Sequence, residues 1–408
     1  MQTQLSPEFA GTPDGQEAEA ILRKCVHCGF CNATCPTYQI FGDELDGPRG
    51  RIYLIKQVLE GQAPTEKTQL HLDRCLTCRN CETTCPSGVD YGHLVDIGRR
   101  IVDERVPRGT ASRALRWALK EGLPSPLFGP AMKIGQSVRG LLPAALQKKV
   151  PAAQAAGRWP TRERARKVLM LAGCVQPSMA PNINSATARV LDAAGIQTLL
   201  APAAGCCGAV RFHLNDQTGG LAQMRANVDA WWPYVERGEV EAIVMNASGC
   251  GVTVKEYGHL LRHDAAYADK ARRISELTRD LSELLPQLVP ALRGRVKASA
   301  GVLAYHPPCT LQHGQKLRGG VEQWLGELGF EVRVAPVESH LCCGSAGTYS
   351  VLQPETAGRL RDRKLGHLGE LQPRAIVSAN IGCIAHLQSG TGVPVRHWVE
   401  VVDEGLIS

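Results

Sequence analysis

The sequence is poor in aromatic residues and has no long apolar run. Phe, Trp and Tyr make up 5% of the 408 residues. No stretch reaches the eighteen or more apolar residues that a spanning helix needs. Residues 1–20 are polar and acidic, without the basic start and apolar stretch of a secretory signal. We therefore expect the protein to stay on the cytoplasmic side.

The signatures of several catalytic sites are missing as well. There is no GxGxxG motif after a strand, no P-loop, no HExxH motif and no Ser-His-Asp order, and nothing resembles a flavin site. These absences argue against a chain that binds a dinucleotide or activates a substrate by itself. We accordingly assign no catalytic residue to this chain.

Cysteine is abundant, with sixteen residues. In a secreted protein so many cysteines would form disulfides, but no secretory signal precedes them here. Their spacing is tight and repeated, and clustered thiols in a reducing compartment more often hold metal.

Two copies of one motif account for the first eight cysteines. Each copy has the spacing Cys-x2-Cys-x2-Cys-x3-Cys-Pro, which is typical of bacterial ferredoxins with two [4Fe–4S] clusters. In that arrangement the fourth cysteine of each motif ligates the other cluster. The predicted ligands are Cys25, Cys28, Cys31 and Cys85 for cluster 1, and Cys75, Cys78, Cys81 and Cys35 for cluster 2. Zinc is the competing interpretation, but its sites usually show two CxxC pairs.

Residues near these motifs suggest further roles. The stretch 36–74 is long for a small ferredoxin, and we expect a helical insertion there, with Pro48-Arg49-Gly50 as a helix start rather than a cluster-positioning element. We also expect the fourth cysteine of each motif to start a helix. Arg74, Arg79 and Lys24 could shift a cluster potential, although solubility is their more ordinary role.

The other eight cysteines form an internal repeat. A single cysteine, a Cys-Cys-Gly sequence and a Gly-Cys pair recur with offsets of 135, 136 and 133 residues. The two sets are Cys174, Cys206, Cys207 and Cys250, and Cys309, Cys342, Cys343 and Cys383. Four thiolates per copy could bind a cubane cluster, a less regular cluster or zinc, or could be structural thiols. Four histidines near the second set could tune a redox centre: His306, His313, His340 and His386.

The repeat also predicts the fold of this region. In each copy a short apolar run precedes the first cysteine, helical periodicity ends near a glycine, and another apolar run precedes the last cysteine. This strand–helix–strand alternation is typical of a parallel α/β sheet. We expect two α/β lobes that pack face to face, with their cysteines in loops at the carboxyl ends of the strands.

The positive charge is concentrated between the two regions. The chain has a net charge of +7, yet residues 105–167 hold fourteen Lys or Arg against two acids, a balance of +12. Such a strip can meet nucleic acid, an anionic membrane surface or an acidic partner, or can be a solvated face. No stacking aromatic residues are interleaved with its charges, so we expect no nucleic-acid partner.

We therefore expect an N-terminal helical ferredoxin-like domain with two [4Fe–4S] clusters (1–104), a basic connector (105–167), and two duplicated cysteine-rich α/β lobes (168–295 and 296–408). The fold class is α+β and α/β. Any additional cluster or metal would sit in the lobes.

The motifs resemble those of glycolate oxidase (glycolate dehydrogenase) iron–sulfur subunits. The resemblance is carried by both ferredoxin motifs and the Cys-Cys-Gly repeats, with GDELDGPRGRIYLIKQVLEG at 42–61, HLDRCLTCRNCETTCPSGV at 71–89, SGCG at 248–251 and HLCCGSAGTY at 340–349. It implies an electron-transfer subunit that serves FAD-binding glycolate oxidase subunits and passes electrons towards the quinone pool. It also implies peripheral association with the cytoplasmic side of the inner membrane.

Other members of the wider superfamily leave alternatives. The chain could serve a lactate or glycerol-3-phosphate dehydrogenase, or could resemble the catalytic subunit of a heterodisulfide reductase. Lobes of the last kind end in CxxC, whereas this chain has Ala247 and Asn380 at the earlier position. Each lobe therefore has four cysteines instead of five, which argues against disulfide chemistry.

Overall fold

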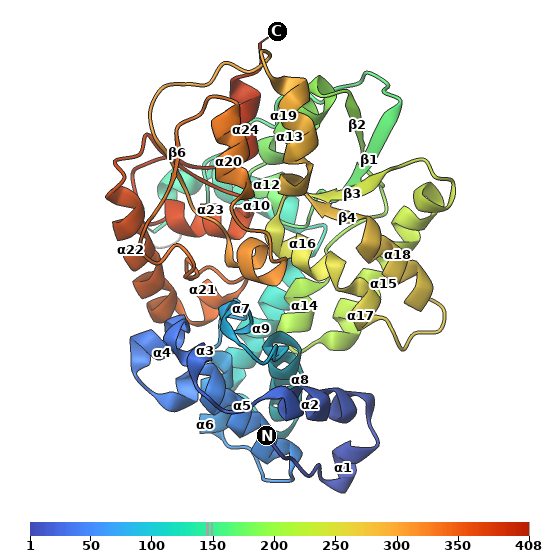
Figure 1. Ribbon diagram of the computed structural model, residues 1–408, viewed down its shortest axis with the longest axis vertical. Coiled ribbons are helices and arrows are strands. Elements are labelled where there is room, and N and C mark those ends of the chain that lie inside the picture. The colour runs from blue at the N-terminus through green and yellow to red at the C-terminus, as the bar shows by residue number, and fades with distance from the viewer. Residues whose placement is uncertain (144–146, 148–149, 408) are drawn as a thin grey trace.

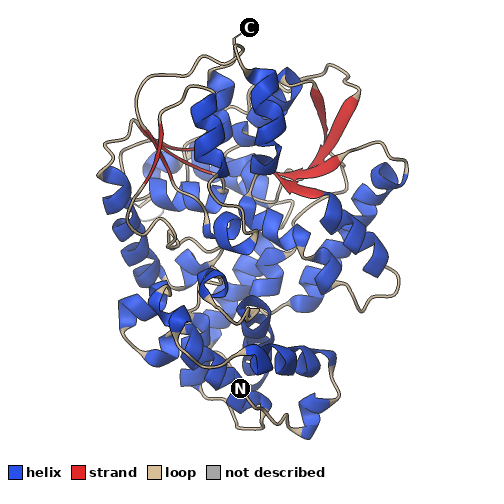
Figure 2. Ribbon diagram, viewed as in Figure 1, coloured by secondary structure: helices blue, strands red, loops and turns tan. Residues whose placement is uncertain are grey.

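The computed structural model describes residues 1–143, 147 and 150–407. Figure 1 shows the blue N-terminal helices at one end of the molecule and two separate sheets at the other, and Figure 2 shows that strands form only a small part of the fold. The predicted order, a helical ferredoxin-like domain followed by two α/β lobes, is confirmed.

The N-terminal domain consists of short helices around one apolar core. Helices α5 and α8 pack against each other, and Ile55 and Leu94 of this pair are fully buried. The elements are α1 (Pro7–Ala10), α2 (Pro13–Lys24), α3 (Phe30–Ala33), α4 (Pro36–Phe41), η1 (Glu44–Asp46), α5 (Pro48–Leu59), α6 (Glu66–Asp73), α7 (Asn80–Thr84) and α8 (Tyr91–Arg105). The predicted helical insertion is therefore present, and Pro48 starts a helix as expected, since its missing N–H costs nothing at that position.

Each lobe has a four-stranded parallel sheet. The strand order is β2-β1-β3-β4 in the first lobe and β6-β5-β7-β8 in the second. The strands are β1 (Arg166–Met170), β2 (Ile196–Leu199), β3 (Ala242–Met245), β4 (Thr278–Asp280), β5 (Leu303–Tyr305), β6 (Val332–Val334), β7 (Ala375–Ser378) and β8 (Val395–His397). Parallel strands buried on both faces need continuous apolar runs, which is why β3 reads Ala-Ile-Val-Met.

Helices connect the strands in the same order in both lobes. The first lobe has α12 (Gln176–Met179), α13 (Asn182–Ala193), α14 (Ala209–His213), α15 (Gln217–Glu236), α16 (Ser248–Lys255), α17 (Tyr257–Leu260), α18 (Ala268–Leu277), η3 (Leu281–Leu284) and α19 (Leu285–Leu292). The second has the π-helical turn η4 (Thr310–Gly314), α20 (Gly320–Glu327), α21 (Tyr349–Leu352), α22 (Pro354–Gly369), α23 (Ile381–Gln388) and α24 (Trp398–Glu404). Gly195 and Gly329 follow α13 and α20 with φ of 82° and 93°, which matches the predicted helix ends.

The two lobes share one apolar core because the last helix of each lobe packs against the other lobe. Helix α24 of the second lobe packs on α13 of the first, and α19 of the first packs on α20 of the second. Trp398 in α24 and Leu288 in α19 are fully buried in this shared core. The lobes therefore pack face to face as predicted. The exact domain boundaries stay a prediction, since an exchanged helix belongs to both lobes.

The connector contains α9 (Thr110–Gly122), α10 (Phe128–Ser137) and η2 (Arg139–Leu141). Part of its charge is neutralised by acids of the neighbouring domains. Arg108 is paired with Asp73 of the N-terminal domain, and Arg164 with Asp192 of the first lobe. Lys148 and Lys149, which contribute to the predicted charge, lie outside the described residues. None of the helices in the described part of the chain combines the length and apolar character that crossing a bilayer requires.

Candidate cluster sites

The two cysteine motifs wind in the same unusual way. The residues on either side of the second cysteine have positive φ in both loops: His27 and Gly29 in the first, and Thr77 and Arg79 in the second. Left-handed residues that alternate with residues of negative φ turn backbone N–H groups to the inside of a loop, where they can meet negative charge. The Thr77 N–H already points at the Cys75 sulfur, 3.4 Å away.

The structure brings the first predicted ligand set to one cavity. Cys25, Cys28, Cys31 and Cys85 all line it, together with apolar residues such as Ile52. Three of these thiols come from the first motif, and Cys85 reaches across from the second. Cys85 therefore lies beside the thiols of the first motif, and its ligation of cluster 1 stays a prediction.

The second predicted set lines a neighbouring cavity. Its thiols are those of Cys35, Cys75, Cys78 and Cys81. Pro48, Cys81 and Tyr91 line both cavities, so the two sites share a wall. Pro48 thus starts a helix and also shapes both sites, although the sequence favoured only the first role.

The fourth cysteine starts a helix in the first motif, as predicted, but not in the second. Cys35 is the N-cap residue of α4, as predicted, but Cys85 follows the end of α7 and leads into turns. The chain needs those turns because it must reverse before α8 begins at Tyr91. Asp90 is the N-cap residue there instead of the cysteine.

The donor sets fit cubane iron–sulfur clusters. Each cavity is lined by the four thiols assigned to its site, which is the ligand set of a [4Fe–4S] cluster, and Cys81 lines the first cavity as well. Burial raises the pKa of Cys31 to about 12, and it raises the pKa values of Cys78 and Cys81 well above the usual range. Buried thiols ionise only with a positive partner, so binding iron here must release protons.

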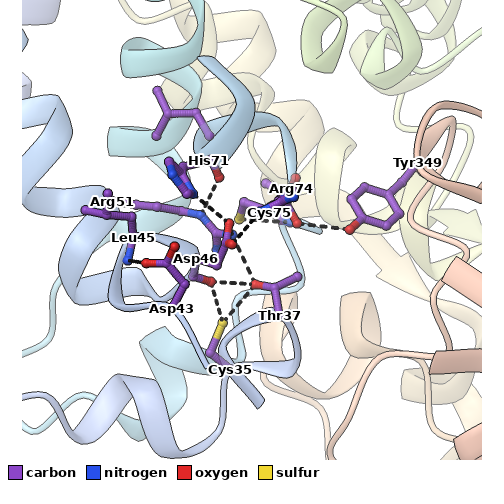
Figure 3. A network of polar contacts seen from close by, with 12 residues as sticks. Cys35, Thr37, Asp43, Leu45, Asp46, Arg51, His71, Arg74, Cys75 and Tyr349 are labelled. Atoms are coloured by element: carbon purple, nitrogen blue, oxygen red, sulfur yellow. Dashed lines mark hydrogen bonds and ion pairs between the residues drawn. The ribbon is translucent and has the colours of Figure 1, made fainter. Parts of the chain in front are cut away.

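A buried ionic network supports cluster site 2 (Figure 3). Asp46 is fully buried and accepts from His71 at 3.0 Å and from Arg74 at 2.7 Å. Arg51 is 1% exposed, donates to the His71 carbonyl at 2.7 Å, and lies 3.5 Å from Asp46. The network joins the insertion to the second cysteine motif, so the loop that carries Cys75 is held firmly.

The sequence reasoning missed both Asp46 and Arg51. They lie in the run GDELDGPRGRI, which carried the resemblance but not their individual roles. Burial alone would lower the pKa of Arg51, but nearby Cys75, Cys35 and Asp46 raise it. Arg51 therefore keeps a positive charge beside cluster site 2.

The three charged residues singled out near the motifs have different surroundings. Arg74 binds Asp46 and stacks on Phe41 with 4.2 Å to the ring centroid, and Arg79 is paired with Glu256 of the first lobe. Both side chains therefore join parts of the fold, and their effect on a cluster potential stays a prediction. Lys24 forms an exposed ion pair with Asp90, which fits the ordinary role of a surface lysine.

The two sites differ in their access. Cys28 is exposed, and its neighbours Val26 and Phe30 are 68% and 63% exposed, so cluster site 1 opens to the outside. Cluster site 2 faces the second lobe instead, because Leu76 and Cys78 pack in one apolar cluster with Cys309 and Cys342. Tyr349 of that lobe also donates to the Arg74 carbonyl at 3.0 Å.

The cysteines of each lobe converge at the strand ends, but Cys250 and Cys383 lie in the helices α16 and α23 and not in loops as expected. All three segments of each set follow the carboxyl ends of parallel strands. The thiols form contact chains, Cys174–Cys206–Cys207–Cys250 in the first lobe and Cys309–Cys342–Cys343–Cys383 in the second. The adjoining His313 and His386 are engaged in hydrogen bonds to Thr83 and to the Ala357 carbonyl.

Comparison with known proteins agrees with this architecture. Residues 21–89 match the 4Fe-4S dicluster domain, and residues 168–255 and 303–388 match the cysteine-rich domain. The chain is 56% identical to the glycolate oxidase iron–sulfur subunit of Escherichia coli K12, over 100% of this chain and 99% of that protein.

More distant relatives were also found. A probable glycolate oxidase iron–sulfur subunit of Bacillus subtilis 168 is 29% identical over 95% of this chain and 92% of its own length. Lactate utilization protein A of Geobacillus thermodenitrificans is 28% identical over 58% of this chain and 98% of its own length. With the full-length match and both domain types present, this chain belongs to the family of glycolate oxidase iron–sulfur subunits.

Proposed function

We propose that this chain is the electron-transfer subunit of a complex that oxidises glycolate to glyoxylate. The oxidation would take place on an FAD-binding partner subunit, and the electrons would leave for the membrane quinone pool. The family supports the iron–sulfur role, and the substrate follows from the name of the Escherichia coli relative. The observation that carries the proposal is the pair of cysteine-lined cavities with a common wall.

The chain's residues have distinct tasks in this function. When bound, two [4Fe–4S] clusters supply one-electron chemistry at potentials that the protein sets. We assign Cys25, Cys28, Cys31 and Cys85 to one and Cys35, Cys75, Cys78 and Cys81 to the other. Arg51 places positive charge beside the second site, and the second lobe covers that site.

The exposed rim of cluster site 1 is the proposed contact for the flavoprotein subunit. Val26 and Phe30 present apolar surface beside the exposed Cys28, whereas cluster site 2 is covered by the second lobe. A partner that delivers electrons must come close to a cluster, and this rim is the open approach. Phe30→Asp should weaken flavin-to-cluster electron transfer at an unchanged iron content. If the Phe30→Asp protein, reduced with dithionite, instead fails to reduce quinone, the rim is the place where electrons leave the chain.

Cys78→Ser tests the relay. The variant should lose about four of eight irons, because one of two cubane sites lacks a ligand. Glycolate-dependent quinone reduction should disappear, while glycolate should still reduce the flavin of the partner subunit. Cys250→Ser, a cysteine of the first lobe, is the matched control and should keep all eight irons. Loss of flavin reduction in Cys78→Ser would contradict the relay role.

The alternative substrates have weaker support. Relatives named for lactate utilization cover only 58% of this chain, and none of those given above is named for glycerol-3-phosphate or a heterodisulfide. Each lobe also lacks the fifth cysteine of the heterodisulfide-type lobes. Glycolate is therefore the substrate we propose for the complex.

The connector is the proposed membrane contact. Its described part exposes several large apolar side chains, the strongest being Leu141 (88%), Leu127 (72%), Ile134 (66%) and Trp117 (64%). The exposed Arg113 stands one helical turn from Trp117. Apolar side chains beside cations suit the interface of an anionic bilayer. We propose that this surface holds the subunit peripherally at the cytoplasmic side of the inner membrane, near the quinone.

A further inference from the structure

Three donor groups meet in the interior of the second lobe. His306 directly follows β5, Cys343 lies in the Cys-Cys-Gly loop, and Cys383 lies in α23. One donor atom from each lies within 4.8 Å of the other two. Their exposures are 1%, 1% and 3%, so no solvent reaches the group. The three residues come from three separate strand ends, and the sheet itself holds them together.

The ring of His306 lacks the partners that a buried histidine needs. Neither Nδ1 nor Nε2 has a hydrogen-bond partner among the described residues. The buried His397, by contrast, bonds the Asn246 carbonyl at 2.9 Å and accepts from the Val399 N–H. A buried polar group without a partner costs about 1–3 kcal/mol, so His306 would be a poor choice for mere packing.

Leu171 shows what packing alone requires at this position. The repeat aligns Cys309 with Cys174, which places His306 opposite Leu171. Leu171 is 3% exposed and belongs to the apolar core of the first lobe. No three donor atoms of the first lobe's described residues come together as those of the second lobe do. The two lobes therefore differ in chemistry although they share a fold.

The spacing of the three donor atoms fits a single ion. One donor atom each of His306, Cys343 and Cys383 lies within 4.8 Å of the other two, and Cys342 adjoins Cys343. A tetrahedral ion with zinc–sulfur bonds of about 2.3 Å separates two ligating sulfurs by about 3.8 Å, so a small movement of these side chains brings them to ligand distance. The thiols of the two cluster sites instead surround cavities. Lys364, which is 2% exposed, lies near these thiols and offsets part of their charge as thiolates.

We propose that the second lobe binds one tetrahedral zinc ion through His306, Cys343 and Cys383. The fourth ligand is one thiolate from the adjoining pair Cys309 and Cys342. Mixed sulfur and nitrogen ligation is typical of structural zinc, which is redox-inert. Because Cys309 and Cys342 pack against Leu76 and Cys78, the ion fixes the protein wall that faces cluster site 2.

Metal content of the full-length, anaerobically purified protein tests the proposal. We expect about one zinc and about eight irons per chain. His306→Leu, which introduces the residue of the first lobe, should lower zinc at least roughly five-fold and leave the iron unchanged. Cys383→Ser should do the same, whereas Cys250→Ser, its counterpart in the first lobe, should keep the zinc. The unchanged iron content shows that the variants fold.

His306→Cys separates ligation from packing. It should retain the zinc, and the zinc K-edge X-ray absorption spectrum should change from a mixed sulfur and nitrogen shell to sulfur alone. Three outcomes would overturn the proposal: wild-type protein without zinc, zinc that survives His306→Leu, or iron above eight that is lost in Cys383→Ser but kept in His306→Leu. The last would indicate an iron–sulfur cluster that does not need the histidine.

Discussion

Arg79, which directly follows a predicted ligand of cluster site 2, is bound by Glu256 of the first lobe. Its Nη2 lies 3.1 Å from Glu256 Oε2, and a second contact joins Nη1 to Oε1. Arg79 has a φ of 57°, a left-handed conformation that is uncommon for residues other than glycine. The lobe therefore holds the cluster loop in its left-handed turn.

Glu256→Gln should destabilise this contact strongly. The side chains of Arg79 and Glu256 are 11% and 24% exposed, and Glu256→Gln leaves the buried Arg79 with the more distant carboxylate of Glu82, 3.9 Å away. We expect a loss of about 3 kcal/mol in the free energy of unfolding, measured by urea denaturation of the cluster-loaded protein. Glu239→Gln, which breaks the exposed pair with Arg237, is the control and should cost less than about 1 kcal/mol. Equal effects would show that the interface does not depend on Arg79.

The same interface should weaken as the pH rises. Burial alone would lower the pKa of His93, but the carboxylates of Glu17 and Glu256 raise it from 6.5 to about 9. A raised folded pKa means that the stabilisation is complete below pH 6.5 and is lost as the pH rises through 9. The shift corresponds to at most about 3 kcal/mol.

Urea unfolding at several pH values measures this effect. The free energy of unfolding should fall between pH 6.5 and 9, and His93→Gln should remove most of that slope. The carboxylate pKa values of Glu17 and Glu256 are lowered, so their contribution is complete above pH 4.5 and does not add to the slope. A wild-type slope that persists in His93→Gln would assign it to another group.

Arg51 should raise the reduction potential of cluster site 2. Its charge is buried beside Cys35 and Cys75, and a nearby positive charge favours the reduced, more negative cluster. Arg51→Met should lower the potential of one cluster by roughly 60 mV, a tenfold change in its reduction equilibrium. EPR-monitored redox titration measures this.

The control for Arg51 is a surface cation near the other site. Lys24→Met removes an exposed charge that is already paired with Asp90, so both potentials should stay within about 15 mV of wild type. If Arg51→Met shifts neither cluster, the arginine serves only to hold the loop. If it removes iron, Arg51→Lys, which keeps the charge, separates loss of the site from loss of the charge.

The sequence predicted the elements that follow from spacing and periodicity. The ferredoxin spacing predicted that Cys85 lies with the first motif and Cys35 with the second, but not that Cys81 lines both cavities, and apolar runs such as Ala242–Met245 predicted the strands. Positional roles that depend on tertiary contacts could not be predicted. Nothing in the sequence pairs Arg79 with Glu256, 177 residues away, or shows that the side chain of Arg51 turns inward.

The exchange of helices α19 and α24 was equally inaccessible to sequence reasoning. Both helices have apolar faces that suit either lobe, so their periodicity does not say which lobe they cover. The difference between the lobes was visible only in part. His306 stood out as a histidine near cysteines, but its unpartnered ring and its nearness to Cys343 and Cys383 required the fold.

Trp117 offers a direct test of membrane contact. Its side chain is 64% exposed beside the exposed Arg113, so an anionic bilayer can take up the ring and attract the charge. Vesicles that contain phosphatidylglycerol should shift the tryptophan emission to shorter wavelength, and phosphatidylcholine vesicles should not. Trp117→Ser should lower vesicle affinity roughly ten- to hundredfold, since burial of a large apolar side chain contributes about 1.5–3 kcal/mol.

The controls distinguish the bilayer from a protein partner. Trp232 is paired with Glu236 and lies under Lys270, so Trp232→Phe should leave vesicle binding and the emission shift unchanged. Raising the salt concentration should weaken binding, because the attraction of Arg113 and its neighbours is screened within about 8 Å at physiological ionic strength. If Trp117→Ser binds vesicles like wild type but no longer co-purifies with the flavoprotein subunit, the connector is a subunit interface. The apolar side chains around Trp117 would then be covered by protein, and the membrane attachment of the complex would have to come from another surface.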